Sequence, residues 1–193
     1  MGFMIIISQN LTNYNFPIPE NSIFRINLAW INDLDELEAI LKKHNFQKIF
    51  IDLPIGRTKP PHNSYSFSEI INILENNLNV KFLAISNVNS PKDIEEYIKL
   101  VPKHISIVPK IESPQGVENI RIIIDSLPNN EKVIMLDHDD LFSSLIKKGE
   151  LPSKFKEYIN SLQNFCFENN VILLRTIGVV FSNLEKRETQ YMK

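Results

Sequence analysis

Cysteine and glycine are both scarce in this sequence, which has one cysteine and five glycines among its 193 residues. One cysteine excludes a disulfide framework and any zinc site that is built from several cysteines. The glycines form neither a G-x-G-x-x-G turn nor a P-loop, so two common nucleotide-binding fingerprints are missing. We interpret the cysteine, Cys166, as a buried thiol on a helix, which is a usual environment for this residue.

An excess of one charge and a long hydrophobic run are also missing. Lys and Arg number 21 against 23 Asp and Glu, and the basic residues are scattered along the chain. This balance argues against nucleic-acid binding and against a polybasic membrane patch. The apolar stretch Met1–Ser8 is too short to cross a bilayer and lacks the features of a signal peptide. We therefore expect a cytoplasmic protein that binds neither nucleic acid nor membrane, folded as one domain over residues 1–193.

Short β-rich runs alternate with helical patterns throughout the chain. The runs are nearly continuous in apolar character, which is typical of parallel strands that are covered on both faces. They lie at Met4–Ser8, Ser22–Leu28, Lys48–Leu53, Val80–Ser86, His104–Lys110, Lys132–Leu136 and Val171–Ile177. Helix-capping residues between them are Asn32, Ser90, Ser113 and Ser153. This alternation predicts an α/β fold with a parallel sheet.

Two parallel architectures compete for this pattern. A Rossmann-type sheet usually carries a glycine-rich turn after its first strand, and that turn is missing here. We therefore predict a shortened TIM-like (β/α) barrel with about seven visible parallel strands, in a chain below the typical length of about 250 residues. A missing strand would leave a seam of exposed strand edges. We expect the charged tail Leu184–Lys193 or a second subunit to cover the seam, and we favour a homodimer.

Charged side chains follow the ends of several predicted strands, where a barrel places its site. Lys110 and Glu112 share one face of their strand because side chains alternate, and that face points inward if the strand lines a barrel. A buried Lys and Glu need a partner or a metal. With Asp140 arriving from the next strand, two carboxylates converge where a hard divalent cation could bind. This pattern favours a metal site, and a simple internal ion pair is the alternative.

Five sequence blocks, in the same order, resemble the catalytic barrel of pyruvate kinase. The blocks run from Ile23 to about Leu141 and read FRINLAW, IFIDLPIGRTK, VKFLAISNVNSPKDIEEY, ISIVPKIESPQGVENI and VIMLDHDDL. The agreement of all five in order indicates the phosphoenolpyruvate/pyruvate barrel superfamily. The segments VPKIESPQGVENI and DDLFSSL also resemble metal-dependent aldolases and lyases of the HpcH/HpaI and citrate-lyase-β type.

The resemblance implies a function and a role for each matching residue. The substrate would be phosphoenolpyruvate, pyruvate or a similar 2-oxo acid, and the cofactor would be Mg²⁺ or Mn²⁺. Glu112 and Asp140 match the two metal-binding carboxylates, and Lys110 matches the lysine that stabilises the enolate. Arg25, Asn27, Asp52 and Arg57 would lie around the substrate. Thr176 would be a second catalytic residue, although Leu174-Arg175-Thr176 stands where the family has Ala-Thr-Gln and its threonine is displaced.

Three departures from the pyruvate kinase pattern limit the function. Ala29 and Trp30 replace a Ser-His pair, Asp139 replaces a glycine, and the loop Lys59–Ser66 is too short to hold the lid domain that closes over nucleotide. These departures argue against an ordinary ADP-dependent kinase. They leave open a carbon–carbon lyase and a non-catalytic barrel that binds a metabolite or a partner protein. Because Lys110, Glu112 and Asp140 are all retained, we expect an enzyme.

Overall fold

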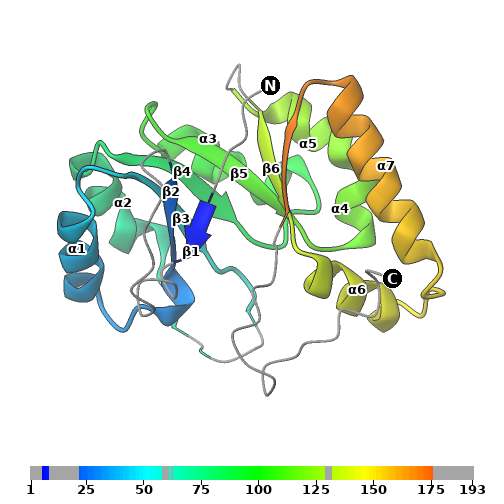
Figure 1. Ribbon diagram of the computed structural model, residues 1–193, viewed down its shortest axis with the longest axis horizontal. Coiled ribbons are helices and arrows are strands. Elements are labelled where there is room, and N and C mark those ends of the chain that lie inside the picture. The colour runs from blue at the N-terminus through cyan, green and yellow to red at the C-terminus, as the bar shows by residue number, and fades with distance from the viewer. Residues whose placement is uncertain (1–5, 9–21, 58–60, 62, 129–131, 176–193) are drawn as a thin grey trace.

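The computed structural model describes residues 6–8, 22–57, 61, 63–128 and 132–175. Its centre is a sheet of seven parallel strands that follow one another in chain order (Figure 1). The strands are β1 Ile6–Ser8, β2 Ile23–Asn27, β3 Lys48–Leu53, β4 Val80–Ile85, β5 Ser106–Ile111, β6 Val133–Leu136 and β7 Ile172–Arg175. The predicted α/β class, the parallel sheet and its seven strands are therefore confirmed.

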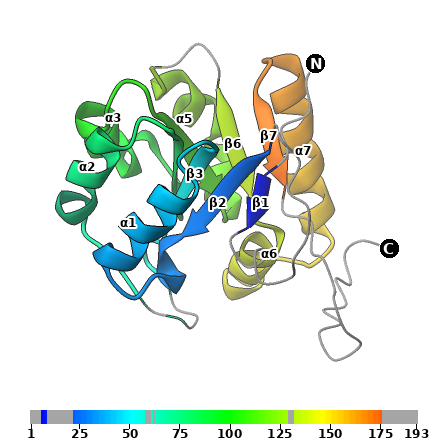
Figure 2. The same ribbon diagram turned by 60° about the vertical axis from the view of Figure 1, so that its left-hand side comes forward.

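From β2 to β7, helices connect successive strands, and they cover the outer face of the sheet (Figure 2). They are α1 Leu34–Lys43, α2 Phe67–Asn76, α3 Glu95–Leu100, α4 Pro114–Glu118, α5 Ile120–Ser126, α6 His138–Lys147 and α7 Lys154–Glu168. Two 3₁₀ turns, η2 Leu28–Trp30 and η3 Pro91–Asp93, follow β2 and precede α3. Within the described ranges, none of these helices combines the length and the apolar character that crossing a bilayer would require.

The sheet curls around an inner core that is separate from the larger core between the sheet and the helices. Buried side chains on the inner face form one cluster, made of Ile23, Phe50, Phe82, Ala84, Val108, Val133, Met135 and Leu174. Ile6 of β1 and Ile172 of β7 pack against the same cluster, so both ends of the sheet reach it. In the part of the chain that the structure describes, β1 and β7 remain the two ends of the sheet. The sheet is thus a curled half-barrel and not a closed TIM barrel, and the tail expected to cover the seam lies outside the described residues.

The inner face changes from apolar to charged along β3, β5 and β6. Phe50 is followed two positions later by Asp52, Val108 by Lys110, and Met135 by Asp137. Because side chains alternate along a strand, each pair shares the inner face. All of these strands are parallel, so their carboxyl ends and the charged residues gather at one end of the sheet. The core therefore places the candidate site at the end expected for a barrel.

The predicted helix starts are largely as expected, with one correction. Ser113 caps α4 by accepting from the backbone N–H of Gly116, and Ser90 forms a capping box at η3. The residue that caps α1 is Asp33 and not Asn32, because the Asp33 side chain accepts from the N–H of Glu36 at 2.8 Å. A carboxylate is the better cap here, since it also opposes the positive end of the helix dipole.

Gly116 lets α4 approach the loop after β4. A Cβ atom at this position would lie 2.7 Å from the carbonyl oxygen of Val88, which is a backbone atom. We expect Gly116→Ala to lower the free energy of unfolding by about 1–3 kcal/mol, although Ala is the better helix former. Urea unfolding measures this, with Gln115→Ala on the exposed side of α4 as the control. A Gly116→Ala variant as stable as the wild type would contradict the close approach.

Candidate functional site

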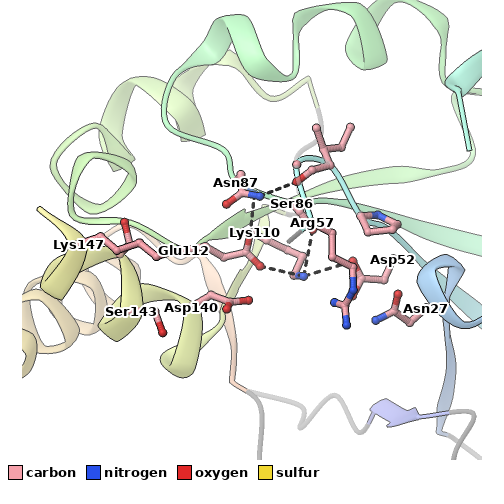
Figure 3. A pocket seen from close by; sticks show the side chains of 14 residues that line it. Asn27, Asp52, Arg57, Ser86, Asn87, Lys110, Glu112, Asp140, Ser143 and Lys147 are labelled. Atoms are coloured by element: carbon pink, nitrogen blue, oxygen red, sulfur yellow. Dashed lines mark hydrogen bonds and ion pairs between the residues drawn. The ribbon is translucent and has the colours of Figure 1, made fainter. Parts of the chain in front are cut away.

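A chain of alternating charges crosses the inner face of the sheet. The Nζ atom of Lys110 lies 2.9 Å from Oε1 of Glu112 and 3.4 Å from Oδ1 of Asp52. The other Asp52 oxygen pairs with the guanidinium of Arg25. Lys110 also donates to the hydroxyl of Ser86 at 3.2 Å (Figure 3). Asp52, Glu112 and Lys110 are only 1%, 4% and 6% exposed, so these ion pairs form in a region of low dielectric.

Burial and pairing compete in setting the protonation of these groups. Burial by itself would lower the pKa of Lys110, but Asp52 and Glu112 outweigh it and raise that pKa. Burial would raise the pKa of Asp52, but Lys110 and Arg25 outweigh it and lower that pKa. For Glu112, burial prevails over Lys110 and the pKa is raised. Lys110 is therefore held as an ammonium and Asp52 as a carboxylate, while the burial of Glu112 is not fully compensated by the protein.

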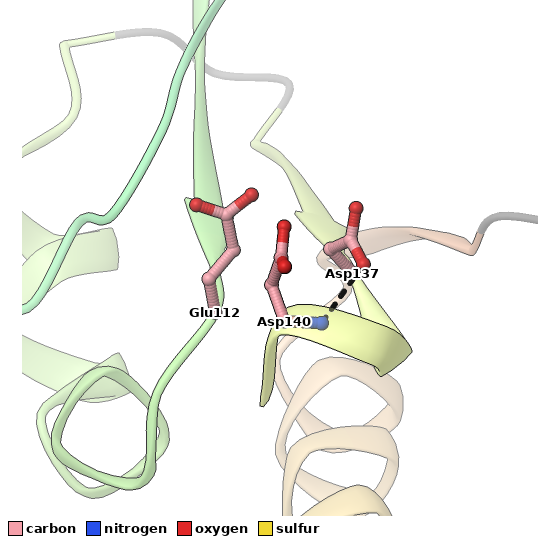
Figure 4. Close-up of side chains that lie close together, drawn as sticks. All are labelled: Glu112, Asp137 and Asp140. Atoms are coloured by element: carbon pink, nitrogen blue, oxygen red, sulfur yellow. Dashed lines mark hydrogen bonds between the residues drawn. The ribbon is translucent and has the colours of Figure 1, made fainter. Parts of the chain in front are cut away.

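Three carboxylates lie close together beside these ion pairs. Glu112, Asp137 and Asp140 each offer an oxygen, and these oxygens lie within 4.8 Å of one another (Figure 4). Glu112 comes at the end of β5, and Asp137 comes at the end of β6, where its side chain caps α6 by accepting from the N–H of Asp140 at 3.2 Å. Carboxylate oxygens are the ligands that Mg²⁺ and Mn²⁺ prefer. The donor set thus fits a hard divalent cation.

A cavity of about 200 Å³ opens at this end of the sheet and brings most of the predicted site residues together (Figure 3). The predicted residues that line it are Asn27, Asp52, Arg57, Lys110, Glu112 and Asp140. Arg25 belongs to the site through its ion pair with Asp52. Thr176, the other predicted catalytic residue, lies outside the described residues.

Two of the predicted substrate residues also have structural contacts. The Asn27 side-chain oxygen accepts from the backbone N–H of Ala29 at 3.0 Å and so caps η2. The Arg57 side chain donates from Nε to the carbonyl oxygen of Pro61 at 2.9 Å. These contacts orient both side chains at the cavity wall, with β2 supplying Asn27 and the segment after β3 supplying Arg57.

Sequence reasoning missed part of the site. Asp137 was not singled out, although it follows Val133 and Met135 at intervals of two, so strand alternation alone would place it on the inner face. Asp140, Ser144 and Lys147 line the cavity at helical spacing along α6, a pattern that could also have been found. Asn87 also lines the cavity and has a φ angle of 57°. It was missed because an asparagine permits this left-handed conformation but does not by itself predict it.

His138 lies next to the acidic triad in sequence but faces another group. Its Nε2 atom lies 2.9 Å from the guanidinium of Arg175, and its ring packs edge-on against Phe155. Burial and the charge of Arg175 lower the pKa of His138. The histidine therefore joins α6 to β7 and α7.

Comparison with known proteins adds information on the fold only. No family model matches the sequence, and no curated protein matches it. Among solved structures, the crystal structure of RipC from Yersinia pestis is similar, with a TM-score of 0.57 and 12% sequence identity. The match covers 84% of this chain and 73% of that chain. Because one fold carries many activities, the function has to be argued from the site itself.

Proposed function

We propose that this protein is a metal-dependent enzyme that binds phosphoenolpyruvate, pyruvate or a similar 2-oxo acid and stabilises its enolate. The observation that carries the proposal is that a buried ammonium, Lys110, pairs with Glu112 of the acidic triad at a cavity that Glu112 and Asp140 line. We further propose that residues 1–193 form a single pyruvate-kinase-like domain, a shortened TIM-like barrel that acts in the cytoplasm. The inner core supports the proposal of a shortened barrel, because side chains from both ends of the sheet pack against it.

Each group at the cavity would have a distinct role. Mg²⁺ or Mn²⁺ held by Glu112, Asp137 and Asp140 would supply a Lewis acid for the substrate oxygens. Lys110 would stabilise the negative charge that develops as the enolate forms, because its ammonium is already oriented by Asp52 and Glu112. Burial of these groups excludes water and strengthens that interaction.

The substrate's acid group would bind to the arginine at the cavity. Arg57 lines the cavity, and a guanidinium matches the planar geometry of a carboxylate or the oxygens of a phosphate. The Asn27 amide lies at the same cavity and would add a polar contact. Arg25 would act indirectly, because its ion pair with Asp52 helps to keep that carboxylate charged beside Lys110.

The protonation of Lys110 separates this mechanism from Schiff-base catalysis. A lysine must be a neutral amine to attack a carbonyl, whereas Asp52 and Glu112 raise the pKa of Lys110. We therefore expect no covalent adduct when the protein is incubated with pyruvate and sodium borohydride. Intact-protein mass spectrometry checks this, with a Schiff-base aldolase as the positive control. Reduced pyruvate attached to Lys110 would contradict the assigned role.

A carbon–carbon lyase is the second candidate within the same chemistry. The segment between β3 and α2 spans only residues 54–66, which supports an enzyme without a domain that closes over nucleotide. Cleavage of a 4-hydroxy-2-oxo acid needs no nucleotide: the C4 hydroxyl loses its proton to a base and becomes a carbonyl, and the C3–C4 bond breaks to leave the enolate. Both reactions would use the same Lys110 and the same triad, so the choice between them does not change the roles given above.

The proposal is tested by the melting temperature in the presence of Mn²⁺ and oxalate, which mimics the enolate of pyruvate. Ligands that bind only the folded state stabilise it, by about 2.7 kcal/mol at a hundredfold excess over Kd. We expect the two together to raise the melting temperature by about 5 °C or more, and by more than either alone. No shift with the pair would contradict the enzyme proposal and favour a non-catalytic barrel.

A further inference from the structure

We infer that Asn87 is a positioning residue that joins the metal-side carboxylate of Glu112 to the loop carrying Arg57. The inference rests on the proposed function, since it takes Glu112 as a metal ligand. Asn87 follows β4 and has a φ angle of 57°, in the left-handed region that residues other than glycine rarely adopt. Asparagine is one of the few residues that enter this region readily.

The backbone of Asn87 fixes the orientation of Glu112. Its N–H donates to Oε2 of Glu112 at 2.6 Å, while Oε1 of the same carboxylate pairs with Nζ of Lys110 at 2.9 Å (Figure 3). Because each oxygen of Glu112 has a partner, its carboxylate cannot turn away from Asp137 and Asp140. Partners that orient a ligand in this way typically change metal affinity by about 10–100-fold when they are lost.

The side chain of Asn87 reaches the other wall of the cavity. Its Nδ2 donates to the carbonyl oxygen of Ile55 at 2.5 Å. The next residue, Gly56, has a φ angle of +66°, and a Cβ built there would lie 3.5 Å from the same Nδ2. Arg57 follows directly and lines the cavity. Asn87 therefore holds the carboxylate of Glu112 through its backbone N–H, and it holds the loop that carries Arg57 through its side-chain amide.

The chain after Asn87 holds this conformation in place. Val88 donates from its N–H to the carbonyl oxygen of Lys110 at 3.2 Å, and its own carbonyl packs against Gly116. The Asn119 side chain donates to the carbonyl oxygen of Asn89 at 2.8 Å. The left-handed backbone is thus held by contacts of the two residues that follow it, as is typical of strained residues that support a site.

Two substitutions separate the backbone role from the side-chain role. Glycine adopts the left-handed region without penalty, so Asn87→Gly keeps the N–H on Glu112 and loses only the amide on Ile55. Asn87→Ala loses the amide and also disfavours the conformation that presents the N–H. Asn170→Ala is the matched control, because Asn170 is the other described non-glycine residue with positive φ, at 52°, and it lies between α7 and β7.

The experiment measures Mn²⁺ affinity by electron paramagnetic resonance and oxalate affinity by calorimetry with Mn²⁺ present. We expect Asn87→Ala to weaken Mn²⁺ binding about tenfold, whereas Asn87→Gly and Asn170→Ala stay within about twofold of the wild type. We expect both Asn87 variants to weaken oxalate binding, again about tenfold. Recovery of Mn²⁺ affinity by glycine is a result that a merely structural role would not give.

The contradicting outcomes are distinct. A folded Asn87→Ala variant that binds Mn²⁺ as the wild type does would overturn the inference and leave the proposed function standing. If the Ala variant does not fold, an unchanged oxalate affinity in Asn87→Gly overturns it instead. A wild-type protein that binds no Mn²⁺ overturns the proposed function, and the inference that rests on it falls with it.

Discussion

Lys110→Met is expected to abolish the enzyme-dependent exchange of pyruvate methyl protons with D₂O. The ammonium of Lys110 is buried and pairs with Glu112 of the acidic triad, and its interaction with the substrate would grow as negative charge develops. Methionine has a similar length and no charge, so the variant removes the stabilisation and fills most of the space. Exchange is followed by proton NMR in the presence of Mg²⁺.

The same variant should retain the metal, because Lys110 acts on the substrate and not on the cation. Its control is therefore the Mn²⁺ affinity, which we expect to fall little or to rise. The variant should also be less stable by about 3–5 kcal/mol, since it leaves the buried carboxylate of Glu112 without its ammonium. Exchange at the wild-type rate in a folded Lys110→Met variant would contradict the role of this residue.

Glu112→Gln is expected to remove most of the Mn²⁺ affinity. The substitution takes one carboxylate from the triad. Loss of a residue that only orients a metal ligand lowers metal affinity by about 10–100-fold, and we expect a larger decrease in Mn²⁺ affinity here. The amide also fits its surroundings poorly, because both Glu112 oxygens accept hydrogen bonds, from Asn87 and from Lys110. Glutamine offers one acceptor for these two donors.

Two further variants make this result interpretable. Asp140→Asn removes a ligand from the same triad without touching Lys110, and it should weaken Mn²⁺ binding in the same way. Glu96→Gln, an exposed position on α3, should leave the affinity unchanged. Electron paramagnetic resonance of free and bound Mn²⁺ measures all three. If Glu112→Gln and Asp140→Asn both bind Mn²⁺ like the wild type, the metal site is elsewhere.

Much of the fold could be predicted because parallel strands leave a strong signal. The run Lys48–Leu53 has the bounds of β3, and each of the other six runs overlaps one strand. The signal is local: a strand covered on both faces must be apolar throughout, whatever its neighbours are. Helix starts were nearly as clear, and the displaced cap at Asp33 shows that adjacent polar residues compete for one position.

The joining of distant segments could not be predicted in the same way. Closure of a barrel would require β1 to pair with β7, and these strands lie far apart in the sequence. The local pattern of either strand does not predict whether they pair. Lys110 and Glu112 could be placed on one face by alternation, but their links to Asp52 and Asn87 depend on strand register. The left-handed conformation of Asn87 likewise depends on the surroundings of β4 and β5.

The central claim is that this cavity stabilises the enolate of a 2-oxo acid, and pyruvate methyl exchange in D₂O tests it most directly. The half-reaction needs no nucleotide and no second substrate. We expect the wild-type protein with Mg²⁺ or Mn²⁺ to exchange the methyl protons faster than the metal alone, and the exchange to stop when the metal is chelated. A protein that is shown to bind pyruvate, yet gives exchange no faster than the metal-only control, would contradict the claim.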